Sequence, residues 1–393
     1  MSKLKGMIKL IGRCLIFLFS HFVPKNKKLW VFGAWFGMRY SDNPKIFFEY
    51  INKNEKSITT VWIAKDKNIV KHIRHLGFNA YYHKSILGLW YQTRAQFAFV
   101  CQALQDDLYS PGISSKTKVI NLWHGFPIKK IMYDILDERV CIKNNIGKLA
   151  DFLSPYNKDR NDYLIATNEL TQRYFSKAFK IPKENILITG FPRNDVFYEK
   201  MNSSDNCYKC IYMPTLRGWK GDECDLFLQY GFDFDKIDKK LREHNIQLYL
   251  RMHPVNSPPE AIVELIKKTN NIFIDSSEDI YSSINNFDCL VTDYSSIYFD
   301  YLLSNKPVVF APFDLDIYLK NEKSLYFEYS DIALEPLATN WLDVISRLIE
   351  LKNEGVSKEY ASQYQKMKNH FHKKNPKEES PFSKLLFEEL KKI

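Results

Sequence analysis

Short apolar runs recur along this chain, and the segments between them carry apolar residues at every third or fourth position. A short apolar run is typical of a buried strand, whereas the wider spacing is typical of a helix with one buried face. Alternation of the two patterns indicates a parallel sheet covered by helices. In the first half the predicted strands are Leu29–Phe32, Thr59–Ile63, Phe97–Val100, Val119–Leu122, Tyr163–Ala166 and Ile186–Thr189, and the predicted helices are Pro44–Asn52, Asn68–His75 and Glu169–Ala178.

A second alternating series follows the polar, turn-rich segment Met201–Asn206, where we expect a domain boundary. We therefore predict an α/β protein with two parallel-sheet domains, at residues 29–200 and 207–365, and a charged helical tail at 366–393. The strands predicted in the second half are Cys210–Met213, Gln247–Met252, Ile272–Ile274, Cys289–Thr292 and Val308–Ala311, and the helices are Phe234–Glu243, Pro259–Lys268 and Ser296–Leu303.

The most informative unit of the second half runs from Asp288 to Pro312 and reads as strand, turn, helix and strand. Ser295 and Ser296 fall at the predicted helix start, where unpaired N–H groups and the helix dipole favour an anion. The alternative is that these serines only cap the helix.

Residues 1–28 form a basic, amphipathic start. The apolar run Cys14–Phe19 is too short to span a bilayer, which needs about 20 apolar residues, and no small-residue cleavage site follows it. We expect a helix lying on an anionic membrane surface, and the alternative is a helix packed on its own domain. The basic residues of this segment are Lys3, Lys5, Lys9 and Arg13.

The formal charge of +10 over 393 residues indicates an anionic partner. The usual nucleic-acid motifs are missing from the sequence, so nucleic acid is not expected. The seven cysteines are irregularly spaced and read as reduced thiols, and Cys207 and Cys210 form a lone C-x-x-C that we interpret as structural.

Polar residues gather directly after predicted strands. Ligands of open parallel sheets bind beyond the carboxyl ends of the strands, so these residues are the candidate site. The two histidines, an arginine suited to phosphate oxygens and the serine-capped helix start together predict a phosphate-handling cleft. The segments are Trp123–Lys130, Gly190–Asp195, Pro214–Arg217, His253–Pro254 and Asp293–Ser296.

Metal and cofactor motifs are not evident in the sequence. HExxH, a P-loop and a G-x-S-x-G elbow are all missing, and we expect neither a metal nor a cofactor. Asp314 and Asp316 spell D-x-D, but they follow the strand at Val308 in a loop that we interpret as a surface turn.

Five segments together resemble the CDP-glycerol glycerophosphotransferases, the primases and polymerases of teichoic acid synthesis that also occur in capsule clusters. The resemblance runs in order from about residue 29 to 320, and Tyr40–Lys45 resembles a further family stretch. It implies a GT-B-like fold, with two Rossmann-like domains across a central cleft. The segments are Asn121–Lys130, Gly190–Asp195, Met213–Arg217, Arg251–Pro254 and Val291–Ser296.

Three departures from the family pattern stand out. Phe126 occupies a position where the family usually has threonine, Glu378–Phe382 replaces a family tail motif, and the long N-terminal region of the large polymerases is missing from this sequence. The acceptor side and the C-terminal helix are therefore less well specified than the donor side.

The resemblance implies transfer of glycerol phosphate from CDP-glycerol to a hydroxyl of a membrane-linked glycan or growing polymer, with release of CMP. By the motif match, His124 would be the general base and His253 a second catalytic residue. Pyrophosphate binding would fall to Thr215, Arg217, Asp293, Ser295 and Ser296, and the acceptor side of the cleft to Gly125, Lys129, Arg193 and Asp195. The enzyme is expected at the cytoplasmic face of the membrane.

Alternatives remain open at this point. CDP-ribitol is chemically close to CDP-glycerol, a nucleotide-sugar glycosyltransferase would share the fold, and a non-catalytic membrane scaffold would share the N-terminal segment. The sequence does not identify the acceptor or the oligomeric state. It also does not distinguish a primase from a polymerase, or a teichoic acid pathway from a capsule pathway.

Overall fold

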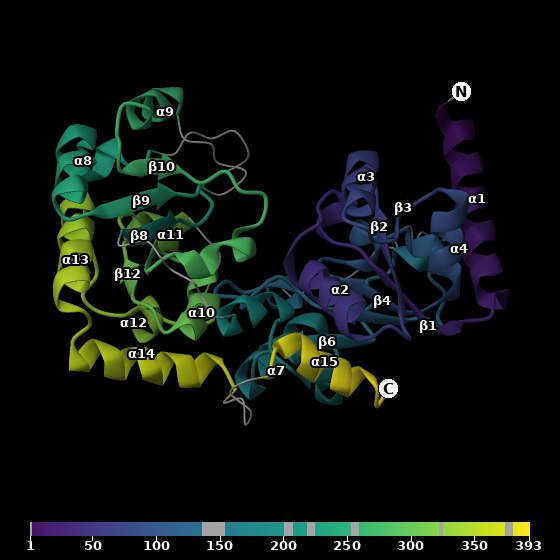
Figure 1. The fold of residues 1–393 in the computed structure, drawn as a ribbon. Helices are drawn as coiled ribbons and strands as arrows, with labels where there is room; N and C mark the ends of the chain where they lie inside the picture. Colours follow the sequence, from purple (N-terminus) through teal and green to yellow (C-terminus); the bar gives the residue numbers. More distant parts are fainter. Residues whose placement is uncertain are drawn as a thin grey trace. The chain divides into compact units, whose positions relative to one another are not determined.

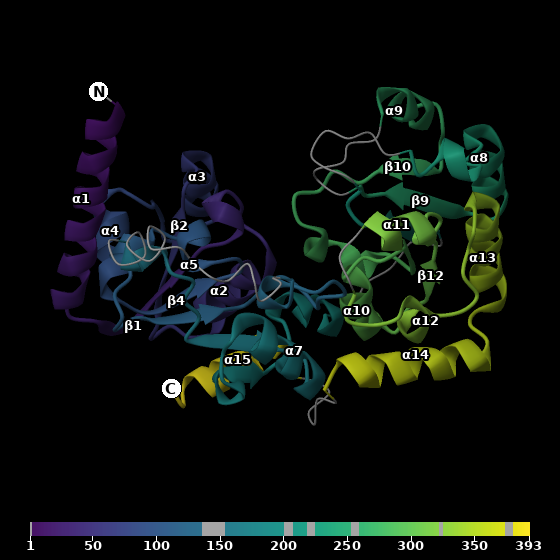
Figure 2. The ribbon, with the colours of Figure 1, turned by 180° about the vertical axis from the view of Figure 1, so that it is seen from behind.

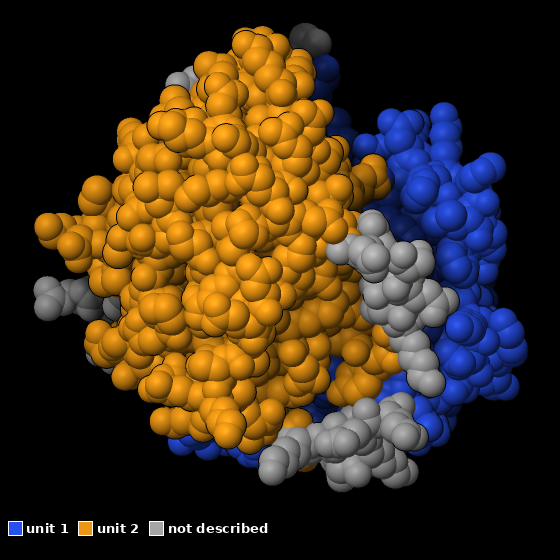
Figure 3. Space-filling view, turned by 60° about the vertical axis from the view of Figure 1, so that its left-hand side comes forward, with its two compact units in different colours: residues 1–124, 132–195, 375–393 blue, residues 125–131, 196–374 orange. Residues whose placement is uncertain are grey.

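The computed structural model describes residues 2–135, 154–199, 207–217, 225–252, 259–321, 325–373 and 380–393. The chain divides into two compact units (Figure 3). Unit 1 comprises residues 1–124, 132–195 and 375–393, and unit 2 comprises residues 125–131 and 196–374. Each unit is built around one parallel sheet (Figure 1).

Within the described residues, the sheet of unit 1 has seven strands in the order β3-β2-β1-β4-β5-β6-β7. All pairings are parallel, with Val31 of β1 between Val61 of β2 and Ala98 of β4. The strands are β1 Asn26–Phe32, β2 Thr59–Ala64, β3 Ala80–Tyr82, β4 Ala95–Val100, β5 Lys118–Asn121, β6 Tyr163–Ala166 and β7 Ile186–Ile188. The helices of unit 1 are α1 Ser2–Phe22, α2 Asp42–Asn54, α3 Lys67–His75, α4 Ile86–Arg94, α5 Leu104–Asp107, α7 Glu169–Phe179 and α15 Phe382–Leu390.

Unit 2 repeats this plan with five described strands in the order β10-β9-β8-β11-β12, again all parallel. Trp341 is fully buried in its core and packs edge-on against Tyr212 of β8. Helices α8 and α13 contact each other, and both ribbon views show them as neighbours (Figure 1, Figure 2). The strands are β8 Tyr208–Met213, β9 Ile246–Leu250, β10 Ile272–Ile274, β11 Cys289–Thr292 and β12 Val308–Phe310, and the helices are α8 Phe234–Glu243, α9 Glu260–Ile266, α10 Ile297–Tyr301, α11 Leu315–Asn321, α12 Tyr329–Ile332, α13 Trp341–Glu354 and α14 Lys358–Phe371.

The predicted strands and helices are confirmed, with ends that shift by a few residues. Burial on both faces explains the accuracy, because β2 and β11 are continuous apolar runs whose residues are almost all buried. Three elements of unit 1 were not predicted, β3, α4 and the short helix α5. Strand β3 has only three residues, two of them half-buried tyrosines, so its pattern is too short to read.

The chain passes from unit 1 to unit 2 after Asp195, whereas the boundary expected at Met201–Asn206 falls on residues outside the described part. The segment 366–393 is divided between the units. Helix α14 belongs to unit 2, and α15 returns to unit 1, where Phe387 packs against Trp30 with ring centroids 6.0 Å apart.

Helix α1 packs on unit 1 through one face only. Arg13 donates to Asn157 at 2.8 Å and lies over the Tyr156 ring, and Phe17 contacts the same ring at 5.7 Å. The opposite face exposes an apolar stripe that includes Met7, Ile8, Ile11, Leu15, Leu18, Phe19 and Phe22. A search of the described residues finds no helix with the length and apolar character needed to cross a bilayer.

Candidate functional site

A polar cluster lies at the switch point of each sheet. At this point the strand order reverses, because later strands are added on the other side of the first strand. In unit 1 this point falls between β1 and β4, and in unit 2 between β8 and β11. The loops beyond the carboxyl ends of such strands are the ordinary ligand sites of open parallel sheets.

In unit 2, the Arg217 guanidinium lies between two carboxylates. Its Nε and Nη2 donate to the two oxygens of Asp314 at 2.7 and 2.9 Å, and Nη2 also donates to Asp293 at 2.6 Å. Nη1 donates to the carbonyl of Thr215 at 2.7 Å. The Arg217 side chain is 11% exposed, so this geometry is fixed largely out of water.

Asp293 ties the end of β8 to the end of β11. Its Oδ1 accepts hydrogen bonds from the backbone N–H and hydroxyl of Thr215, at 2.8 and 2.7 Å, and from the N–H of Tyr294 at 2.5 Å. The loops that carry Thr215, Arg217 and Asp293 are thereby held together at one point.

The pairing of Arg217 with Asp314 favours the charged form of both groups. Burial by itself would lower the pKa of Arg217, but Asp293 and Asp314 raise it above its ordinary value. Burial opposes ionisation of Asp314 as well, yet the bonds from Arg217 bring the pKa of Asp314 below its ordinary value. One guanidinium charge therefore neutralises part of two carboxylate charges.

Two stacked aromatic rings lie next to the same guanidinium. Its central carbon lies 4.9 Å from the ring centroid of Tyr294 and 5.1 Å from that of Tyr318, and the two rings stack at 4.0 Å. The Lys129 ammonium lies 4.8 Å from the Tyr318 ring, which brings a second cation to this cluster.

Ser295 and Ser296 are half-buried at the start of α10. Ser296 occupies the N-cap position, but its side chain makes no capping hydrogen bond there. The two serines therefore follow Asp293 at the start of a helix, as the sequence predicted.

In unit 1, a backbone carbonyl fixes the tautomer of His124. Its Nδ1 lies 2.8 Å from the Cys101 carbonyl oxygen. A carbonyl only accepts, so Nδ1 carries the proton and Nε2 keeps its lone pair. Burial lowers the pKa of His124, although the bond to Cys101 and the charge of Asp42 partly oppose that shift.

Buried side chains hold the loop that carries His124. The Asn43 amide donates to the carbonyls of Leu122 and Trp123, both at 3.0 Å, and accepts from the Arg193 N–H at 3.0 Å. Arg193 Nη1 in turn donates to the His124 carbonyl at 2.9 Å and to Asp42 at 3.0 Å.

Backbone strain explains why this loop needs such support. Trp123 has φ +50° and Gly125 has φ +132°, on either side of His124. Left-handed conformations at non-glycine residues persist only where the surroundings impose them.

The four residues that the sequence grouped as the acceptor side are divided between the two units. Arg193 is 4% exposed and paired with Asp42, and the Asp195 carboxylate accepts from the first N–H groups of α15, including that of Phe382 at 2.5 Å. Gly125 and Lys129 belong to unit 2. His253 lies outside the described residues.

Asp314 is not the plain surface turn that the sequence indicated, and that prediction is wrong. Its side chain is 11% exposed and forms the bidentate partner of Arg217. Asp42, Asn43 and Asp107 were also not singled out. The match at Tyr40–Lys45 was the available signal for the first two, whereas nothing in the local sequence marks Asp107.

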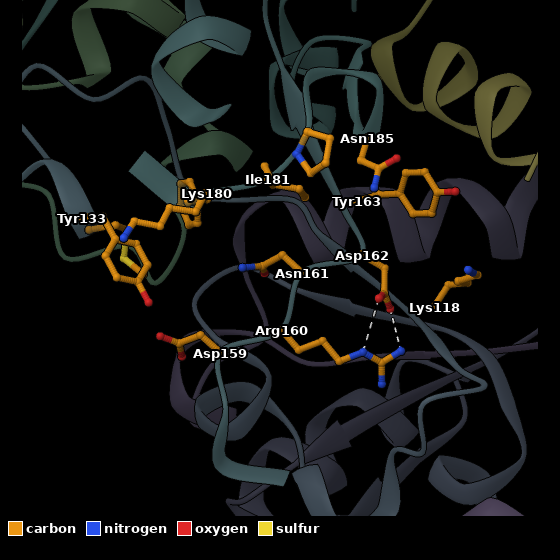
Figure 4. A pocket seen from close by; sticks show the side chains of 13 residues that line it. Lys118, Tyr133, Asp159, Arg160, Asn161, Asp162, Tyr163, Lys180, Ile181 and Asn185 are labelled. Atoms are coloured by element: carbon orange, nitrogen blue, oxygen red, sulfur yellow. Dashed lines mark hydrogen bonds and ion pairs between the residues drawn. The ribbon is translucent and has the colours of Figure 1, made fainter. Parts of the chain in front are cut away.

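A cavity of about 470 Å³ lies in unit 1 away from His124 (Figure 4). Lys118 and Tyr163 of its lining are the first residues of β5 and β6, whereas His124 follows the opposite, carboxyl end of β5. Figure 4 also shows the Arg160 and Asp162 side chains paired with each other. We therefore do not include this cavity in the candidate site.

Among the described residues, no three His, Cys, Asp or Glu side chains are grouped to hold a metal ion.

Two parallel sheets, each with a polar cluster at its switch point, define an α/β protein of the class that binds ligands beyond its strand ends. A model of the CDP-glycerol:poly(glycerophosphate) glycerophosphotransferase family matches residues 15–380. The chain belongs to this family. The expected CDP-glycerol glycerophosphotransferase is therefore confirmed at the level of the family.

Individual relatives agree with this assignment. The teichoic acid glycerol-phosphate transferase of Staphylococcus aureus is 29% identical over 355 residues, which are 84% of this chain and 86% of that protein. The teichoic acid poly(glycerol phosphate) polymerase of Bacillus spizizenii is 27% identical over 358 residues, 86% of this chain and 87% of that protein. A solved structure of the wall teichoic acid polymerase TagF covers 100% of this chain and 98% of its own, with a TM-score of 0.73 and 22% identity, and confirms the GT-B-like α/β fold.

Proposed function

We propose that this enzyme transfers glycerol phosphate from CDP-glycerol to a hydroxyl of a membrane-linked, teichoic-acid-type acceptor, and that His124 is the general base. The observation that carries the proposal is the tautomer of His124. With its proton on Nδ1, held by the Cys101 carbonyl at 2.8 Å, the ring presents an unprotonated Nε2 at neutral pH. That nitrogen takes the proton of the acceptor hydroxyl as the hydroxyl attacks the β-phosphorus and CMP leaves.

The donor site is proposed at the switch point of unit 2. Thr215, Arg217, Asp293, Ser295 and Ser296 surround the ends of β8 and β11, and Lys129 adds a positive charge. The fixed hydroxyl, N–H and cationic donors among them would stabilise pyrophosphate charge without rearranging during the reaction, while Asp293 accepts and holds the loops in place. His253 is proposed as a further donor to the pyrophosphate, on the motif match alone.

Arg217 has a more specific role in this proposal. Because Asp293 and Asp314 already hold the guanidinium, Arg217 fixes the shape of the site as much as it attracts phosphate. Arg217, Asp293 and Asp314 together carry one net negative charge. In this proposal the electrostatic attraction for CDP-glycerol therefore comes from Lys129 and from the N–H groups at the start of α10.

The test of the proposed base is His124→Ala. We expect transfer to fall at least a hundredfold, while CDP-glycerol affinity by calorimetry stays within about threefold, because the base acts on the acceptor. Turnover near that of the wild type would exclude His124 as the base.

A membrane surface is the proposed location of the acceptor, and α1 and α4 together form the proposed contact. The apolar stripe of α1 continues into a groove of about 450 Å³ lined by Ile16, Phe19, Leu87 and Trp90, among others. Both ribbon views place α1 along α4 (Figure 1, Figure 2). The contact surface is therefore wider than the N-terminal segment that the sequence indicated.

Helix α4 has its apolar residues on the outside. Ile86 is 87% exposed and Trp90 46%, whereas Gln92 and Thr93 are buried. Such inversion is unfavourable in water, and it is favourable when the outer face enters the boundary between headgroups and acyl chains.

Positive charges accompany this surface, as contact with anionic lipid requires. Lys5 and Lys9 are exposed on α1, and the Arg94 guanidinium lies 4.9 Å from the Trp90 ring. Each basic residue near an anionic surface contributes about 1 kcal/mol. Arg13 is not part of this set, because it faces Asn157 and Tyr156.

A further inference from the structure

The loop after β4 contains a buried carboxylate with an unusual set of partners. Asp107, at the end of α5, is fully buried. Its Oδ2 accepts from the backbone N–H groups of Cys101 and Gln102, at 2.7 and 2.8 Å, and its Oδ1 accepts from the N–H of Phe36 at 2.9 Å. The nearby ammonium of Lys65 donates to the carbonyls of Gln105 and Asp106.

These bonds link the two loops of the switch point. Phe36 follows β1, and Cys101 follows β4. The fit between the loops is close, because a Cβ on Gly33 would lie 2.7 Å from the Asp107 carbonyl oxygen. Trp35 and Phe36 have φ +47° and +62°, so the loop after β1 adopts a conformation that needs outside support.

The same peptide that Asp107 holds also holds His124. The Gln102 N–H donates to Asp107 at 2.8 Å, and the Cys101 carbonyl, which belongs to the same peptide group, accepts from His124 Nδ1. A peptide group polarised at its N–H by a carboxylate presents a stronger acceptor at the next bond in the chain. We infer that Asp107 is the positioning residue for His124, acting through the Cys101 backbone to fix the tautomer and direction of the imidazole.

This inference rests on the proposed role of His124 as the base. It assigns to a backbone carbonyl the orienting task that a side-chain carboxylate performs in other histidine bases. Burial raises the pKa of Asp107 to about 6 although three N–H groups oppose that shift, so the carboxylate is ionised at neutral pH.

A purely structural carboxylate would have a different effect when it is changed. Replacing a structural carboxylate would change only the stability of the protein. Replacing a positioning residue would change kcat and the tautomer of the His124 imidazole as well. Asp107→Asn keeps the size of the side chain but replaces one acceptor oxygen with an NH₂ group, which faces the N–H donors and displaces the Cys101 peptide.

The experiment compares Asp107→Asn with Asp106→Asn in the full-length protein. Asp106 is the adjacent carboxylate on α5, and its backbone carbonyl, which the substitution retains, is what Lys65 contacts. For Asp107→Asn we expect kcat to fall about 10- to 100-fold, the loss typical of a misplaced reacting group. The KM for CDP-glycerol should stay within about threefold, because the donor residues belong to unit 2. Asp106→Asn should retain kcat.

The second readout is the tautomer of His124, measured by NMR on protein with ¹⁵N-labelled histidine and assigned by the signal that His124→Ala lacks. The wild type should show a protonated Nδ1 and an unprotonated Nε2, and Asp107→Asn should show a mixture of the two tautomers. Asp107→Glu, which keeps the charge but moves the oxygens, is the second variant and should show the same changes with a smaller loss of kcat.

A folded Asp107 variant with wild-type kcat and an unchanged tautomer would overturn the inference, and so would an equal loss of kcat in Asp106→Asn. Failure of the proposed function looks different, because His124→Ala would then be active. An inactive His124→Ala beside a fully active Asp107→Asn would reject the role of Asp107 alone.

Discussion

Replacement of Ile86 by aspartate should detach the enzyme from anionic membranes without harming its fold. Ile86 is the first residue of α4, and the side chain of Ser85 already caps that helix. An acidic residue in the first turn is compatible with the helix dipole. The substitution therefore removes apolar surface at a position where the protein itself gains nothing from it.

The exposure of Ile86 sets the size of the effect. The side chain is 87% exposed, and full burial of a large aliphatic side chain contributes about 1.5–3 kcal/mol. Loss of that contribution, with about 1 kcal/mol of repulsion between the new carboxylate and anionic lipid, amounts to roughly 2.5–4 kcal/mol. The partition coefficient should fall roughly 60- to 700-fold.

The assay is sedimentation with vesicles that contain phosphatidylglycerol, over a range of lipid concentration. The matched control is Leu342→Asp, because Leu342 is 53% exposed and also lies in the first turn of a helix, α13 of unit 2. Leu342→Asp should bind vesicles as the wild type does, and deletion of residues 1–27 should weaken binding as Ile86→Asp does.

Two results would refute this reasoning. Wild-type binding by Ile86→Asp would show that α4 does not touch the membrane, whatever α1 does. Equal weakening in Leu342→Asp would show that the effect of the charge does not depend on the face of the protein.

Three further predictions concern the candidate site. Arg217→Ala should lower the free energy of unfolding by roughly 3–5 kcal/mol in urea denaturation, since it leaves Asp293 and Asp314 without their cation, and it should weaken CDP-glycerol binding; unchanged stability would contradict the buried pairing. Because burial lowers the pKa of His124, the base stays unprotonated below the ordinary histidine value of about 6.5, so the acidic limb of the kcat–pH profile should lie below that value; a limb above it would contradict the environment described for His124. Activity should largely survive EDTA, because cationic side chains and helix N–H groups neutralise the pyrophosphate in the proposed site, and complete loss restored by magnesium would contradict this.

The sheets were predictable because their strands are buried on both faces. The strand at Cys289–Thr292 was predicted with the bounds that the structure shows. A short apolar run bounded by polar residues is too short for a helix and is typical of a buried strand. Helix α4 was missed for the opposite reason. Its exposed apolar residues and buried Gln92 and Thr93 reverse the usual pattern, so periodicity does not place it.

The sequence singles out candidate site residues where they follow a strand directly, and it misses those that depend on distant partners. His124, Arg217 and Asp293 all stand at strand ends. The pairing of Arg193 with Asp42 joins positions 151 residues apart, and the bond from Phe36 to Asp107 joins positions 71 apart. Only the folded chain shows that Arg193 is buried and that Asp107 and His124 bond to the same stretch of backbone at Cys101 and Gln102.

The measurement that tests the central claim most directly is acceptor-dependent CMP release from CDP-glycerol by the wild-type enzyme, with His124→Ala, CDP-ribitol and nucleotide sugars run in parallel. The account predicts release from CDP-glycerol that requires a lipid-linked acceptor, is slower with CDP-ribitol, is undetectable with nucleotide sugars and is lost in His124→Ala. Faster release from CDP-ribitol or from a nucleotide sugar, or undiminished release by His124→Ala, would contradict it.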